Sequence, residues 1–120
     1  EARLKEWPKA FVLVSHDRYF LRAVCNEIVE LELAGAVRFT QYSLMVFGHA
    51  RIPIIDWMRE QAAESLLHAT LAGEEVTTLG GRVSLSIGEL VGTHHDAVDQ
   101  MMEEMVHHER RGLEKISARR

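Results

Sequence analysis

The feature that most constrains how this chain folds is its scarcity of proline. Two prolines occur among its 120 residues, Pro8 and Pro53, and proline breaks a helix interior because it lacks a backbone N–H and clashes with the preceding turn. The proline-free stretches are long enough for helices well above the average of ~11–12 residues. A chain of this length fits one small domain. We therefore expect a few long helices packed against one another.

Apolar residues at helical spacing locate three helices. The first is predicted from Asp17 to Phe47, and the second over residues 54–79 with Pro53 in its first turn. Gly80-Gly81 is expected to end the second helix, since glycine readily adopts the left-handed conformation that follows a helix. The third helix is predicted over about residues 87–117.

The links between these helices are predicted to be tight turns, so that consecutive helices run antiparallel. Ser86 and Glu89 have the spacing of a capping box at the start of the third helix. Residues 9–14 are a short apolar run that indicates an extended, strand-like segment. The predicted fold class is all-α: a bundle of three long helices over residues 17–120, preceded by a short extended N-terminal arm over residues 1–16.

Composition excludes several classes of function. The 18 acidic residues outnumber the 14 basic ones, which gives a net charge of -4 and a pI near 6.0, whereas a nucleic-acid-binding protein is expected to carry a basic face. No apolar stretch is long enough to span a membrane. The single cysteine, Cys25, cannot form an internal disulfide and suits the reducing cytoplasm. We therefore expect neither nucleic acid nor a membrane as a partner.

Three acidic residues and a histidine of the predicted helices are candidates for a functional site. Glu32 and Glu109 project from the apolar stripes of two different helices, and His68 shares a helix face with Glu64, four residues earlier. A carboxylate buried without a partner is costly, so such groups pair, become neutral or bind a cation. Carboxylates from three helices together with an imidazole are a donor set that holds iron or manganese. The alternative is that long, glutamate-rich helices place a carboxylate near an apolar stripe by chance.

Two histidine doublets occur in the third predicted helix, His94-His95 and His107-His108. Adjacent side chains on a helix point about 100° apart. Neither doublet can therefore chelate one ion by itself, and the pattern favours no metal-binding role for them. The methionines of the same helix are better explained as core residues than as haem ligands; they are Met101, Met102 and Met105.

Residues 2–32 resemble a short segment of the ABC-F ATPases. The match is carried by Leu-Val-Ser-His-Asp-Arg-Tyr-Phe-Leu at residues 13–21, and the resemblance places His16 as the switch histidine that senses the nucleotide γ-phosphate. The chain has no Gly-x-x-x-x-Gly-Lys-Ser/Thr loop to hold phosphates and magnesium, so we expect no ATPase activity. In those proteins the part that corresponds to residues 17–34 is a helix followed by a strand. A strand needs ladder partners, which this chain does not supply, so we expect a helix throughout.

From about Glu32 onward the chain resembles the bacterioferritin-like branch of the ferritin-like superfamily. The resemblance is carried by four stretches: Arg38–Gly48, Glu64–His68, Glu74–Gly81 and His107–Gly112. That family folds as a four-helix bundle and binds two metal ions, usually iron. Its ligands are a Glu on the first helix, Glu-x-x-His on the second, a Glu on the third and Glu-x-x-His on the fourth.

The resemblance implies which residues of this chain would bind metal. Glu32 matches the Glu of the first helix, His68 the His of the second, and Glu109 the Glu of the third. Ser65 stands three residues before His68 in place of Glu, and Glu64 is expected to substitute for it with a changed angle. The implied metal ligands are thus Glu32, Glu64, His68 and Glu109, with iron as the expected metal and manganese as the alternative.

The chain ends at Arg120, before a fourth helix, so the resemblance implies an incomplete ferritin-like bundle with an exposed apolar groove. We expect a second copy of the chain to cover this groove in a homo-oligomer. Three functional hypotheses follow. The first is an iron-binding ferritin-like protein with Fe(II) oxidation or iron storage. The others are a metal-free structural bundle from a gene fusion, and a nucleotide-binding remnant of an ABC-F ATPase that keeps His16 and Asp17.

Overall fold

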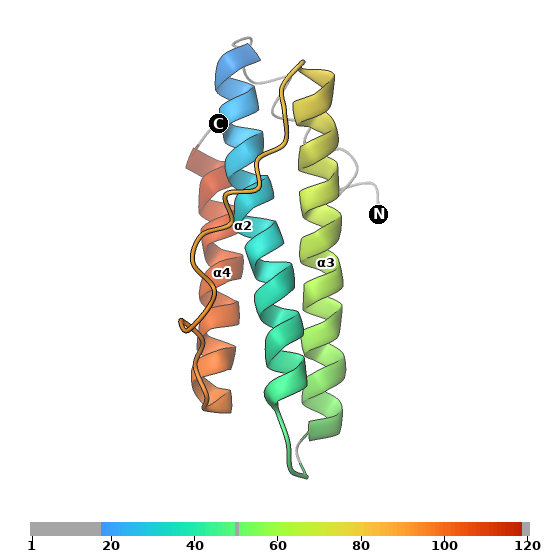
Figure 1. Cartoon of the computed structure of the whole chain (residues 1–120), viewed down its shortest axis with the longest axis vertical. Helices are drawn as coiled ribbons and strands as arrows, with labels where there is room; N and C mark the ends of the chain where they lie inside the picture. Colours follow the sequence, from blue (N-terminus) through green and yellow to red (C-terminus); the bar gives the residue numbers. More distant parts are fainter. Residues whose placement is uncertain (1–17, 50, 119–120) are drawn as a thin grey trace.

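The structure consists of three long helices. A computed structural model describes residues 18–49 and 51–118, with side chains as far as residue 115. In this part of the chain the helices are α2, Arg18–Met45, α3, Arg51–Thr78, and α4, Val98–Ala118, and no β-strand is present (Figure 1). The predicted all-α class is confirmed.

The segment with the ATPase resemblance is helical as far as it is described. Helix α2 continues without interruption through the part that forms a strand in those ATPases. The predicted arm over residues 1–16, together with His16 and Asp17, lies outside the described residues. None of the described helices is long and apolar enough to cross a membrane.

The end of α3 follows the predicted glycine signal. Gly80 has a φ of +81°, in the left-handed region that glycine adopts without a steric penalty. Its N–H donates to the Thr77 carbonyl at 3.0 Å, and the Gly81 N–H donates to the Val76 carbonyl at 2.9 Å. These two bonds form a Schellman motif. Gly80-Gly81 therefore ends the helix as predicted.

The third helix begins later than the predicted residue 87. Helix α4 starts at Val98, and residues 79–97 form a long connection. Gly88 and Gly92 have φ values of +83° and +76°, which a right-handed helix excludes. The connection runs back along the bundle, so α4 is parallel to α3 and antiparallel to α2 (Figure 1). The predicted tight turn and the capping box that starts the helix are therefore wrong.

Helix α2 is the centre of the arrangement, because it packs against both α3 and α4, whereas the backbones of α3 and α4 do not approach each other. Toward the N-terminal end of α2, a first apolar cluster joins it to α3: Leu21, Val24, Ile28, Val29, Ala72 and Leu79. Toward its C-terminal end, a second cluster joins all three helices: Phe39, Tyr42, Val46, Ile55, Met58, Ala62, Met101 and Met105. The stretch of α2 between these clusters carries Glu32.

Candidate metal centre

Glu32 is a buried carboxylate at the middle of the bundle. It is 8% exposed, and it is the one buried acidic residue among those that the structure describes. Its position on the inner stripe of α2 follows from the helical period, since it lies four residues after the buried Ile28. A charged carboxylate at such a place needs hydrogen-bond partners.

Both oxygens of Glu32 are bound by imidazoles from the other two helices. Nδ1 of His68, on α3, lies 2.7 Å from Oε2 of Glu32, and Nε2 of His108, on α4, lies 3.0 Å from Oε1. An ionised carboxylate only accepts hydrogen bonds, so both ring nitrogens donate. Three helices thus meet at one carboxylate.

The contacts lower the pKa of Glu32 and raise the pKa of His68. Burial by itself would raise the pKa of Glu32, but the hydrogen bonds and charges of His108 and His68 outweigh it and hold the pKa below its ordinary value. The hydrogen bond to Glu32 raises the pKa of His68 against the effect of burial, and the negative charges of Glu32, Glu64 and Glu109 add to the rise. In the metal-free protein the pair is therefore stabilised as carboxylate and imidazolium.

The ring of His108 fits into a space that a glycine leaves open. A Cβ atom at Gly35 would lie 2.5 Å from Nε2 of His108, which is far inside van der Waals contact. The edge of the ring also packs against Phe39, with ring centroids 4.9 Å apart and an interplanar angle of 85°. Gly35 and Phe39 therefore hold the ring against Glu32.

Of the four ligands that the resemblance implies, the structure brings Glu32 and His68 into contact. Glu64 and Glu109 are exposed and lie near enough to His68 for their charges to act on it. Ser65, at the position where the resemblance implies a Glu, is buried. That Glu64 and Glu109 bind metal stays a prediction.

His108 is the residue that the sequence analysis passed over. The two members of its doublet do point apart: His108 contacts Glu32, while His107 is exposed. The available signal was its position three residues after Met105 and seven after Met101, on the buried stripe of α4. A helical doublet can place one histidine toward the core even though its two members cannot share one ion.

A second polar cluster lies one to three turns further along α2. Nε of the buried Arg38 is 3.0 Å from a carboxylate oxygen of Glu104 on α4, and the Tyr42 hydroxyl donates to the same carboxylate. Arg38 also binds Thr93 of the connection, and the Tyr42 oxygen accepts a bond of 3.1 Å from the backbone N–H of His95. This cluster fastens α4 and the end of the connection to α2.

A groove of about 460 Å³ opens beside His108, between α2, α4 and residues 86–90 of the connection. Gly35 and Phe39 contribute to its wall on the α2 side, and His107 and His108 on the α4 side. Arg38 and Glu104 of the second polar cluster lie along it as well. The groove gives small molecules and ions a route to His108.

The donor set suits a metal, but its present geometry is that of a hydrogen-bonded group. Carboxylate and imidazole are ligands of iron, zinc and manganese. In the described part of the chain, no group of three or more His, Cys, Asp or Glu is already arranged to hold an ion. The imidazoles face the two oxygens of Glu32 instead of a shared point, so binding would require these rings to turn.

Comparison with known families identifies the class of this fold. The sequence model of the ferritin-like domain family matches residues 23–119, which is more than half of the chain. The chain therefore belongs to the ferritin-like family. The long connection between α3 and α4 agrees with this, since ferritin-like bundles contain one such crossover.

A second comparison gives a shorter likeness. The chain is 34% identical over 73 residues to an uncharacterized ABC transporter ATP-binding protein, YfmR, of Bacillus subtilis (strain 168). The match covers 60% of this chain and 12% of that protein. It agrees with a likeness to ATP-binding cassette proteins, while the assignment to the ABC-F branch stays a prediction. No solved structure matches the chain significantly.

Proposed function

We propose that this protein binds iron at Glu32 and His68 and that its role is Fe(II) oxidation or iron storage. The observation that carries the proposal is the buried Glu32 carboxylate, 2.7 Å from an imidazole of the neighbouring helix, in a chain of the ferritin-like family. Bound iron supplies a redox-active centre that passes between Fe(II) and Fe(III). Glu64 and Glu109, whose charges reach His68, are the proposed additional carboxylates.

The residues of the chain have defined tasks in this proposal. Glu32 supplies a negative charge that offsets the charge of the cation, and the apolar clusters on either side limit the access of water. His68 must lose the proton that it donates to Glu32 before Nδ1 can bind a metal. Because Glu32 raises the pKa of His68, iron binding is expected to weaken as the pH falls.

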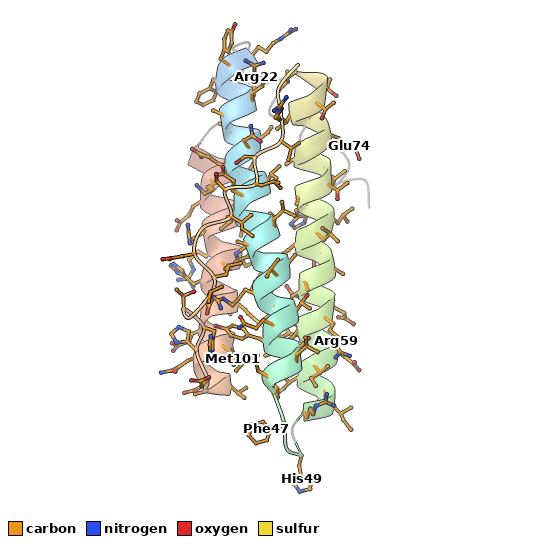
Figure 2. All side chains as sticks on the ribbon, viewed as in Figure 1. Arg22, Phe47, His49, Arg59, Glu74 and Met101 are labelled. Carbon is orange, nitrogen blue, oxygen red and sulfur yellow. The ribbon has the colours of Figure 1, made fainter. Side chains whose placement is uncertain are left out.

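Anaerobic titration with Fe(II), followed by gel filtration and elemental analysis, tests the proposal. The variant Glu32→Gln/His68→Gln keeps the size of both side chains and removes their charge and imidazole. The matched control is Glu74→Gln/His49→Gln, because these two residues are exposed and lie near opposite ends of the bundle (Figure 2). We expect the parent and the control to retain iron and the site variant to lose it.

Three outcomes decide between the hypotheses. Iron retained by the site variant as by the parent would mean that the site is elsewhere. A folded, helical parent that binds no iron would leave the metal-free bundle as the better reading. Thermal stabilisation by ATP with magnesium would instead support the nucleotide-binding remnant.

We also propose that the chain self-associates over the face of α4 that carries Val106 and Leu113. Val106 and Leu113 lie seven residues apart on one helix face with Glu109 between them, and they are 49% and 61% exposed. Apolar side chains exposed along one face favour association. Light scattering after gel filtration tests this: Leu113→Asp is expected to shift the protein toward monomer, whereas Leu44→Asp, at a somewhat more exposed site on α2, is not. A monomeric parent would contradict it.

A further inference from the structure

We propose that His108 is a metal ligand and that the site holds a single divalent ion between Glu32, His68 and His108. The inference rests on the proposed iron site and deepens it, because the ligand pattern that the resemblance implies has no histidine on the third helix. It changes both the number of metal ions and the identity of one ligand. Three features of the structure support it.

The first feature is the spacing of the donor atoms. The two nitrogen–oxygen distances at Glu32 are 2.7 Å and 3.0 Å. Two ligands at right angles on one ion, each about 2.1 Å from it, are about 3.0 Å apart. The present nitrogen–oxygen distances are therefore close to the separation of two such ligands. Each nitrogen that binds the ion gives up the proton that it now donates to Glu32, and the neutral ring then carries its proton on the other nitrogen.

The second feature is the seat of the His108 ring. The His108 ring leaves no room for a Cβ atom at Gly35, and Phe39 packs against the ring. The neighbouring His107 has no comparable seat and is exposed. The lack of a Cβ at Gly35 lets the ring lie close against α2, where Nε2 reaches Glu32. These contacts hold the ring so that Nε2 lies beside the Glu32 carboxylate, where the proposed ion would bind.

The third feature is the lack of buried donors for a second ion in the described part of the chain. Ser65 occupies the buried position where the family pattern places a second carboxylate, and Glu64 is exposed beside it. Two imidazoles and one carboxylate are the donor set of mononuclear non-haem Fe(II) sites, which keep open positions for small ligands. His108 itself lines the groove beside it.

Titration with Co(II) tests the inference, because its visible absorption reports the ligands without any assay of activity. The variants are His108→Gln, which can still donate a hydrogen bond to Glu32, and His107→Gln as the matched control one residue away. We expect about one Co(II) per chain in the parent and a loss of affinity of ~100-fold or more in His108→Gln. The cobalt spectrum should change in that variant. His107→Gln should bind as the parent does.

Gly35→Ala is a second variant, which displaces the ring without removing it. Its added Cβ is expected to weaken Co(II) binding. This variant keeps the inference testable if circular dichroism shows that His108→Gln does not fold. Unchanged affinity in folded His108→Gln, or two ions per chain lost together in Glu109→Gln, would overturn the inference while the iron site at Glu32 and His68 stands. A parent that binds neither Co(II) nor Fe(II) would overturn both.

Discussion

Helix α2 makes two interfaces of different chemistry. Against α3 it is mainly apolar, with side chains such as Val29 and Met58 fully buried. Against α4 the apolar contacts are concentrated at Met101 and Met105, and polar pairs run along the same interface. In order along α4, those pairs are Glu104 with Arg38, His108 with Glu32, and Lys115 with Glu27.

The two interfaces differ in how much of their stability depends on protonation. Burial of apolar surface stabilises a helix pair at any pH, because it depends on no particular protonation state. Polar pairs depend on charge and exact partners, and a buried group that loses its partner becomes costly. The α2–α3 hairpin is thus held mainly by apolar burial, with the Glu32–His68 contact as its polar pair, whereas α4 is attached largely through polar pairs.

The largest expected effect is in the apolar interface. Met58 is 0% exposed and lies in the cluster that joins all three helices. Met58→Ala should lower the free energy of unfolding by ~2–5 kcal/mol through lost burial and a cavity. Urea denaturation followed by circular dichroism measures it. Substitutions at exposed positions give no such loss. A loss below about 1 kcal/mol would therefore mean that the interface is not closely packed.

A smaller effect is expected at the polar attachment of α4. Glu104→Ala leaves the buried Arg38 and the Tyr42 hydroxyl without their carboxylate, which should cost ~1–3 kcal/mol. Hydrogen exchange should rise in α4 more than in α3. The control is Glu103→Ala, since Glu103 is exposed on the neighbouring position. Equal exchange in both helices would contradict the separation of the two interfaces.

The pH dependence of stability follows from the group at Glu32. Because the pKa of Glu32 is lowered on folding, its contribution is present above the ordinary value of 4.5 and is lost as the pH falls through the lowered pKa. Because the pKa of His68 is raised, its contribution is present below the ordinary value of 6.5 and is lost as the pH rises through the raised pKa. The contribution should therefore be greatest between these values.

Thermal melting of metal-free protein across the pH range tests this dependence. His68→Gln should remove much of the decline on the alkaline side, and Glu32→Gln should remove it on the acidic side. The exposed His49→Gln serves as the control. A melting temperature that responds to pH alike in all three variants would show that other groups control it.

The smallest effect compares two glycines of the α2–α4 interface. Beside Gly112 an added Cβ would meet Leu31 Cδ2 at an ordinary 3.9 Å, so Gly112→Ala should stabilise the protein by about 0.5–1 kcal/mol through helix propensity. Gly35→Ala should give no gain, because its Cβ collides with His108. Denaturant midpoints measure both, and an equal gain at the two sites would mean that the His108 ring moves freely.

Local rules accounted for much of the fold. The period of apolar residues located α2 and α3, and Gly80-Gly81 ended α3 as expected, since capping depends on neighbours within one turn. The same rules failed from residue 87 to 97. Glycine is compatible with a helix interior and with a left-handed turn, and its neighbours did not indicate which conformation Gly88 and Gly92 adopt.

Part of the candidate site was also predictable. Glu32 and His68 follow from helical period and family resemblance, and the structure places them 2.7 Å apart. His108 does not follow, because its contact with Glu32 spans 76 residues. It depends on the direction of α4, which the connection reverses relative to the prediction.

The amino-acid sequence alone thus specified long helices, their inner faces and one acidic residue placed among apolar neighbours, because these properties repeat over a few residues. Tertiary structure decided how α4 is directed and which side chain completes the surroundings of Glu32. Those properties depend on how a long connection crosses the bundle and on the open space at Gly35. Both involve residues far apart along the chain, whose meeting no local pattern encodes.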